Sequence, residues 1–98
     1  RPDKMVQPPE ILRAVALFYQ VSTAELSGPG RDRRTVEARQ VAGYLLCKKT
    51  PLTLTEIAGL IGRRDHTAVI HARKRIENRL KNDFFLSRQL EEIEMELS

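Results

Sequence analysis

The polar residues whose types and spacing suit a chemical role lie together in the middle of the chain. Asp65, His66 and Thr67 come directly before an apolar series at helical spacing, which puts them on the first turn of a helix. There a carboxylate can accept a hydrogen bond from a cytosine amino group, a threonine methyl can pack on a thymine methyl, and a histidine ring can donate to a base edge. Asp65 is equally consistent with a helix N-cap and no further role, because aspartate is among the best caps.

Long cationic side chains follow on the later turns of the same segment, and they can reach phosphates: Arg73, Lys74, Arg75 and Arg79. The 98 residues carry a net charge of +4, but that charge is unevenly spread. Residues 31–82 hold thirteen basic and five acidic groups, net +8, whereas residues 83–98 hold one basic and five acidic groups, net −4. A basic middle segment is typical of a protein with a polyanion partner, although a solvated arginine-rich helix surface would carry the same charge.

Other chemistries lack the residues they need. His66 and His71 are five apart, about 140° around a helix, whereas a metal-binding pair needs i and i+4. The sequence has no Gly-x-x-x-x-Gly-Lys-Ser/Thr phosphate loop and no pairing of a nucleophile with a base. Its single cysteine, Cys47, lies in an apolar helical segment and is expected to pack. We therefore expect no enzyme activity, no catalytic residue, no metal and no cofactor in this chain.

The elements that position the polar cluster are predicted to be helices throughout. Ser22 with Glu25, and Thr53 with Glu56, have the capping-box form that starts a helix. Gly62 is expected to be a left-handed C-terminal cap. The basic stretch 31–34 is expected to be a loop. The fold class is all-α, with about six helices and a helix-turn-helix core of the Trp-repressor type, and the expected helices are 10–20, a short one after 22, 35–49, a short one after 53, 65–82 and 83–98.

Two short helices that meet at a glycine turn are typical of a helix-turn-helix. We expect a single domain over residues 1–98, in which residues 1–9 are a linker remnant and residues 53–82 form the helix-turn-helix. The recognition helix starts near residue 65, and residues 83–98 form an acidic C-terminal helix. The sequence shows no signal peptide and no apolar run long enough to span a bilayer. It also lacks an initiator Met, so we expect a fragment of a longer protein.

The segment Arg64-Asp65-His66-Thr67-Ala68-Val69-Ile70-His71-Ala72 resembles the signature of the DnaA family, the bacterial chromosomal replication initiators, whose usual form is Arg-Asp-His-Thr-Thr-Val-x-His-Ala. Ala38-Arg39-Gln40, Leu54-x-Glu56-Ile57 and the loop Gly30-Arg31-Asp32-Arg33 also fall at the spacing of that family. The resemblance covers about residues 10 to 98. It implies the C-terminal DNA-binding domain, which binds the origin repeats called DnaA boxes.

The resemblance also implies site residues. Major-groove base contacts fall on Asp65, His66 and Thr67, and an arginine of the basic loop enters the adjacent minor groove. Ungapped counting puts that arginine at Arg31, with Arg33 as the alternative. The implied phosphate contacts are Arg33, Arg39, Gln40, Thr55, Arg64, His71 and Arg75. The sequence departs from the family pattern at Ala68, where the family has a second threonine, and at Thr55, where a proline is common; Asp32 lowers the charge of the loop.

The expected partner is double-stranded DNA, bound by a monomeric domain in the cytoplasm at the nucleoid. ATP is expected only in an upstream ATPase domain. Within DNA binding, the alternative is the helix-turn-helix of a related transposase or repressor with a different target. Two other classes stay open: contact of the N-terminal linker with acidic phospholipid, and docking of a protein on the acidic last helix.

Overall fold

The structure is a computed structural model that describes residues 6–97, and within that range it consists of helices without strands. The all-α prediction and the expected number of six helices are confirmed. The helices are α1 (Pro8–Tyr19), α2 (Thr23–Leu26), α3 (Arg33–Lys49), α4 (Leu54–Leu60), α5 (His66–Leu80) and α6 (Phe84–Glu96).

Short-range hydrogen bonds explain where most helices begin. Ser22 and Thr53 form capping boxes at the starts of α2 and α4, as the sequence predicts. Asp65 caps α5 and Asp83 caps α6, each by accepting a backbone N–H of the first turn. Such a cap satisfies a donor that has no partner within the helix.

Two helices begin two residues earlier than expected. α3 starts at Arg33 because the carboxylate of Asp32 accepts the Thr35 N–H at 3.1 Å and its hydroxyl at 3.0 Å. Arg33 therefore lies on the first turn of α3, so our assignment of residues 33 and 34 to a loop is wrong. α1 starts at Pro8, because proline fits the first helical turn, where no N–H donor is needed. Residues 8 and 9, expected to be linker, thus belong to the helix, and residues 1–5 lie outside the described range.

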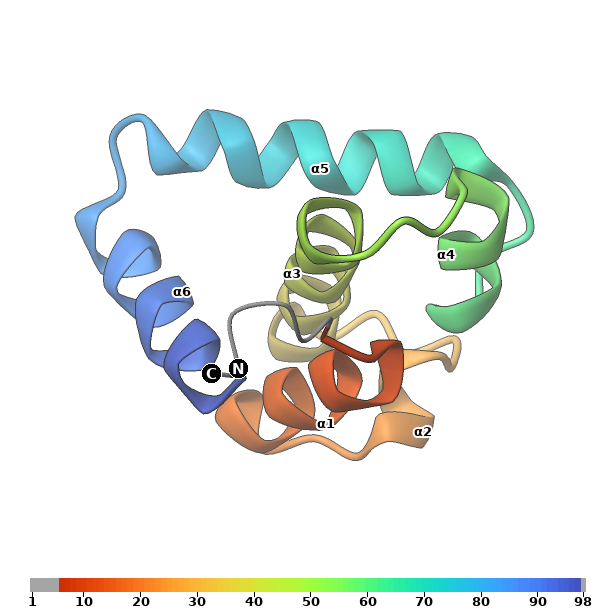
Figure 1. The fold of residues 1–98 in the computed structure, drawn as a ribbon, viewed down its shortest axis with the longest axis horizontal. Coiled ribbons are helices and arrows are strands. Elements are labelled where there is room, and N and C mark those ends of the chain that lie inside the picture. Colours follow the sequence, from red (N-terminus) through yellow and green to blue (C-terminus); the bar gives the residue numbers. More distant parts are fainter. Residues whose placement is uncertain (1–5, 98) are drawn as a thin grey trace.

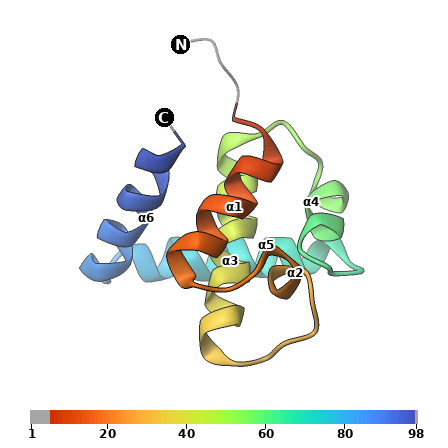
Figure 2. The ribbon, with the colours of Figure 1, turned by 90° about the horizontal axis from the view of Figure 1, so that it is seen from below.

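α3 forms the centre of the core. It packs against α1, α2, α4 and α5, and α6 closes one end by packing against α1 and α5. Figure 1 shows α3 nearly end-on, with α5 crossing on one side and α1 on the other, and Figure 2 shows the same arrangement from below. The buried face of α3 includes Val41, Leu45 and Leu46, which meet Ile76 of α5 and Ile11 of α1 in one apolar cluster.

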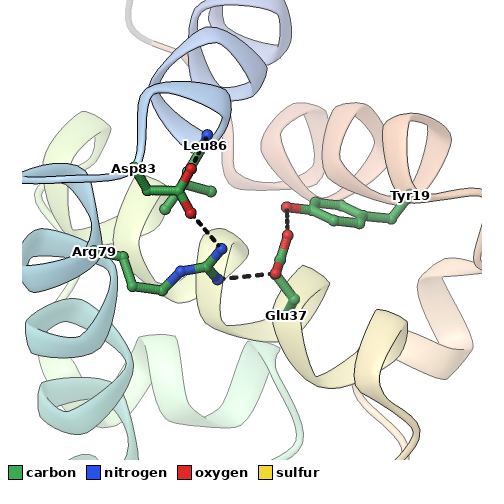
Figure 3. Close-up of polar contacts among 5 residues, drawn as sticks. All are labelled: Tyr19, Glu37, Arg79, Asp83 and Leu86. Carbon is green, nitrogen blue, oxygen red and sulfur yellow. Dashed lines mark hydrogen bonds and ion pairs between the residues drawn. The ribbon is translucent and has the colours of Figure 1, made fainter.

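A chain of polar contacts joins four helices beside this core (Figure 3). The Tyr19 hydroxyl donates to one oxygen of Glu37 at 2.7 Å, and Arg79 donates to the other at 2.9 Å. Arg79 also donates to Asp83 at 3.0 Å, and the second oxygen of Asp83 accepts the Leu86 N–H at 2.9 Å. The network therefore connects α1, α3, the C-terminal turn of α5 and the start of α6.

The network perturbs its own titratable groups. Burial alone would raise the pKa of Glu37, but the hydrogen bonds from Tyr19 and Arg79 hold that pKa below its ordinary value. Burial, followed by the hydrogen bond to Glu37, raises the pKa of Tyr19. The hydrogen bond to Glu37 raises the pKa of Arg79. These shifts stabilise the ionised form of Glu37 and the neutral form of Tyr19, which are the forms that make this hydrogen bond.

Candidate nucleic-acid interface

The turn between α4 and α5 depends on one glycine. Gly62 follows Ile61, the C-cap of α4, and has a φ of +69°, in the left-handed region that side chains disfavour. A Cβ at this position would lie 1.8 Å from the carbonyl oxygen of Ser27. The left-handed conformation at Gly62 is thus confirmed, and the turn also makes a close approach to the end of α2 that only glycine permits.

The first turn of α5 presents the three predicted base-reading residues to solvent. Asp65 accepts the Thr67 N–H at 3.0 Å, and this hydrogen bond lowers the pKa of its carboxyl group. His66 Nδ1 lies 3.3 Å from Asp65 Oδ1, and the two side chains are 53% and 67% exposed. Thr67 is exposed as well. Asp65 is therefore an N-cap, and its ionised, exposed carboxylate is also accessible to a partner in front of the helix.

A hollow of about 470 Å³ lies between the start of α3 and the second half of α5. Four predicted contact residues line it: Arg31, Arg33, Gln40 and Arg75. Val36, Glu37 and Arg79 complete its wall, so the polar network of Figure 3 lies directly behind it. Folding thus brings the basic segment around residue 31 next to the middle of α5, about 40 residues later in the chain.

A second hollow of about 280 Å³ adjoins the first, because Val36 and Gln40 line both. His71 lines it from α5, and Arg63 lines it from the turn before that helix. Ala68 is also in its wall, so a hydroxyl-free side chain stands where the family signature has its second threonine. The two hollows together follow one face of α5 from residue 68 to residue 79.

Arg39 occupies a different environment from the other predicted phosphate contacts. It is 7% exposed, and its guanidinium group donates to four backbone carbonyls at 2.7–3.2 Å, those of Glu25, Leu26, Gly28 and Gly30. Burial, and then the neighbouring positive charge of Arg63, lower the pKa of Arg39. These donors of Arg39 are therefore directed at the chain itself.

A family profile described as "Bacterial dnaA protein helix-turn-helix" matches residues 8–76, more than half of the chain. The chain belongs to this family, the C-terminal helix-turn-helix domains of bacterial DnaA. The Chromosomal replication initiator protein DnaA of Thermomicrobium roseum is 44% identical over 80 residues, which cover 82% of this chain and 17% of that protein. The same-named protein of Mesorhizobium japonicum is 46% identical, covering 90% and 18%, and that of Corynebacterium jeikeium is 34% identical, covering 93% and 16%.

This DnaA domain therefore spans less than a fifth of the length of these relatives. The family profile ends within α5, so α6 lies beyond the matched residues. Two further predicted phosphate contacts belong to the helix-turn-helix itself and are exposed: Thr55 on the first turn of α4 and Arg64 just before α5.

The sequence does not identify two residues of this surface, Arg63 and Glu37, and it does not show the pairing of a third, Arg79. Arg63 donates to the Gly28 carbonyl and, at 3.2 Å, to that of Ile61, and no local signal distinguishes it from Arg64 beside it. Glu37 pairs with Arg79 across 42 positions of sequence. Arg79 is one of the cations that the sequence suggests could reach phosphates, and in the structure it pairs with Glu37 and Asp83.

Three further features of residues 6–97 concern metal binding, thiol reactivity and membrane insertion. Within residues 6–97, no three histidine, cysteine, aspartate or glutamate side chains are grouped closely enough to hold a metal ion. Cys47 is half-buried, and burial raises the pKa of its thiol, which makes it less reactive. None of the helices in the described range is both long enough and apolar enough to cross a membrane.

Proposed function

We propose that this DnaA domain binds double-stranded DNA sequence-specifically at DnaA boxes, as the DNA-reading module of a replication initiator. The start of α5 enters the major groove, where Asp65, His66 and Thr67 contact base edges. Arg31 enters the adjacent minor groove. The observation that supports this proposal is the hollow in which Arg31, Arg33, Gln40 and Arg75 come together beside α5.

The charges around α5 suit the two kinds of contact that such binding requires. Arg33, Arg64 and Arg75 are exposed cations that lie beside or just before the recognition helix, where they contact phosphates and fix its register. Gln40 and His71 contribute hydrogen bonds from the same face. Thr55 contacts phosphate through its hydroxyl at the start of α4. Base edges are then read by short polar side chains, which carry the sequence information.

Selection from random duplexes, followed by competition with a scrambled duplex, tests this function directly. We expect recovery of a DnaA-box-like sequence and discrimination that Asp65→Asn reduces about tenfold. Asparagine caps helices as well as aspartate does, so the substitution changes the reader and keeps the cap. Glu91→Gln on α6 is the matched control, since it removes an exposed carboxylate away from α5.

Salt dependence tests the phosphate contacts separately. Three arginine contacts predict that log affinity falls with log salt concentration at a slope of about −3 or steeper. A slope near zero, or an unchanged discrimination ratio for Asp65→Asn, contradicts the proposed binding mode. Recovery of an unrelated consensus sequence would favour a transposase-like or repressor-like target instead.

The remaining expectations concern the longer protein and the surroundings of the domain. ATP binding is proposed only for a separate upstream domain, and the domain is proposed to act in the cytoplasm as a monomer. Contact with acidic phospholipid near the N-terminus stays a prediction, because residues 1–5 lie outside the described part of the chain.

A further inference from the structure

Two arginines from separate elements converge on the loop between α2 and α3. Arg39 extends from α3 and reaches four carbonyls of residues 25–30, with its closest contact at 2.7 Å to the Leu26 oxygen. Arg63 extends from the turn of the helix-turn-helix and donates to Gly28, which Arg39 also contacts. One carbonyl oxygen, that of Gly28, thus accepts from both guanidinium groups.

The same loop touches the turn a second time through the backbone. The Ser27 carbonyl lies where a Cβ on Gly62 would be, so residues 27 and 28 contact residues 62 and 63 directly. Arg31, the predicted minor-groove residue, follows Gly28 by three positions, and Asp65 follows Gly62 by three. The segment that carries Arg31 and the segment that carries the base readers are therefore joined at one contact.

The geometry also explains how two like charges can lie so close together. Burial, and then the charge of Arg63, lower the pKa of Arg39. Arg39 donates to four carbonyl oxygens and Arg63 to two, and the negative ends of these dipoles partly offset the repulsion between the two cations. Arginine presents five donors in a rigid fork, so one side chain can orient several carbonyls at once. Lysine has no such fork, and neither position is replaceable by charge alone.

We propose that Arg63 and Arg39 are positioning residues that hold the Arg31 loop at a fixed place relative to the recognition helix, so that minor-groove and major-groove contacts form in one register. This inference rests on the proposed function. In it, Arg39 and Arg63 act through Arg31 and contribute to affinity without reading bases themselves. A loop that is ordered before DNA arrives loses little conformational entropy on binding.

A double-mutant cycle on Arg63 and Arg31 tests the proposal. The affinity of the wild-type domain, Arg63→Gln, Arg31→Ala and the double variant is measured for the selected duplex and for its single-base variants. We expect Arg63→Gln to weaken binding about fivefold or more, with lost discrimination only at the base pairs that Arg31→Ala identifies. In the Arg31→Ala background, Arg63→Gln should change affinity by less than about twofold, because coupled residues are not additive.

Two further variants keep the experiment decisive. Arg13→Gln removes one exposed charge from α1 and should leave every affinity unchanged. Arg63→Lys keeps the charge but lacks the fork, so it should restore affinity only in part, whereas a residue that simply contacts a phosphate would be fully replaced by lysine. Thermal melting shows which variants are folded, and if Arg63→Gln is not, Arg63→Lys takes its place in the cycle.

The outcomes separate the two proposals. Independent, multiplicative effects of Arg63 and Arg31 would overturn the positioning role, as would lost discrimination at base pairs that Asp65→Asn identifies. Both results leave the proposed DNA binding intact. A wild-type domain that fails to discriminate the selected duplex from a scrambled one refutes the proposed function and, with it, the positioning role.

Discussion

Gly62→Ala should destabilise this domain more than a glycine-to-alanine substitution at any of the other four glycines. The alanine would have to adopt a φ of +69°, and its Cβ would lie 1.8 Å from Ser27 O, 2.6 Å from Ser27 C and 3.0 Å from Ser27 Cα. All three atoms are backbone, so no side chain can rotate away. Relief requires the turn and the end of α2 to separate.

The magnitude follows from two contributions. A non-glycine residue in the left-handed region costs about 1–2 kcal/mol, and forcing a methyl group into a packed contact costs about 1–3 kcal/mol. Together they predict a loss of about 2–5 kcal/mol in the free energy of unfolding. Small domains have a total of about 5–15 kcal/mol, so the variant should unfold at a much lower urea concentration.

Gly59→Ala is the matched control. Gly59 lies in α4, three residues before Gly62, and a Cβ there would meet nothing within 4 Å. Alanine is about 0.8–1 kcal/mol more favourable than glycine inside a helix, so this variant should be more stable than wild type. Urea unfolding monitored by circular dichroism measures both. Equal midpoints for Gly62→Ala and wild type would refute the close approach of Gly62 to Ser27.

Three further predictions concern hydrogen bonds within the fold. Tyr19→Phe removes the donor 2.7 Å from Glu37 and should cost about 1–2 kcal/mol of unfolding free energy; Tyr44→Phe, whose hydroxyl is not hydrogen-bonded within residues 6–97, should be neutral in the same urea titration. Glu37 and Asp83 have pKa values lowered in the folded state, so the stability they provide is present above about pH 4.5 and is lost as the pH falls further. Thermal melts that showed no loss between about pH 6 and about pH 3 would contradict this. Thr53→Ala removes the cap of α4 and should cost about 1 kcal/mol, with most of it restored by Thr53→Ser; an equal loss in both variants would argue against the cap.

The helix starts were largely predictable because the interactions that set them are local. Ser22, Thr53 and Asp65 each accept a backbone N–H two or three residues ahead, and side-chain type and spacing reveal such contacts. Asp32 follows the same rule as the N-cap of α3. The predicted start of this helix is two residues late because Asp32 was assigned to the basic loop. The exposure of Asp65, His66 and Thr67 at the start of α5 follows from the same local rule, and their role as base readers stays a prediction.

The sequence by itself determined the helices, the glycine turn and the basic middle segment, since these depend on residue type and on neighbours within one helical turn. Tertiary structure decided what each arginine does. Arg39 reaches carbonyls up to 14 residues away and Arg79 pairs with Glu37 across 42, while Arg31 and Arg75 meet at one hollow. An arginine has the same charge and the same five donors wherever it lies. The packing of α3 against α2 and the following loop turns the donors of Arg39 toward the chain, and the packing of α3 against α5 does the same for Arg79.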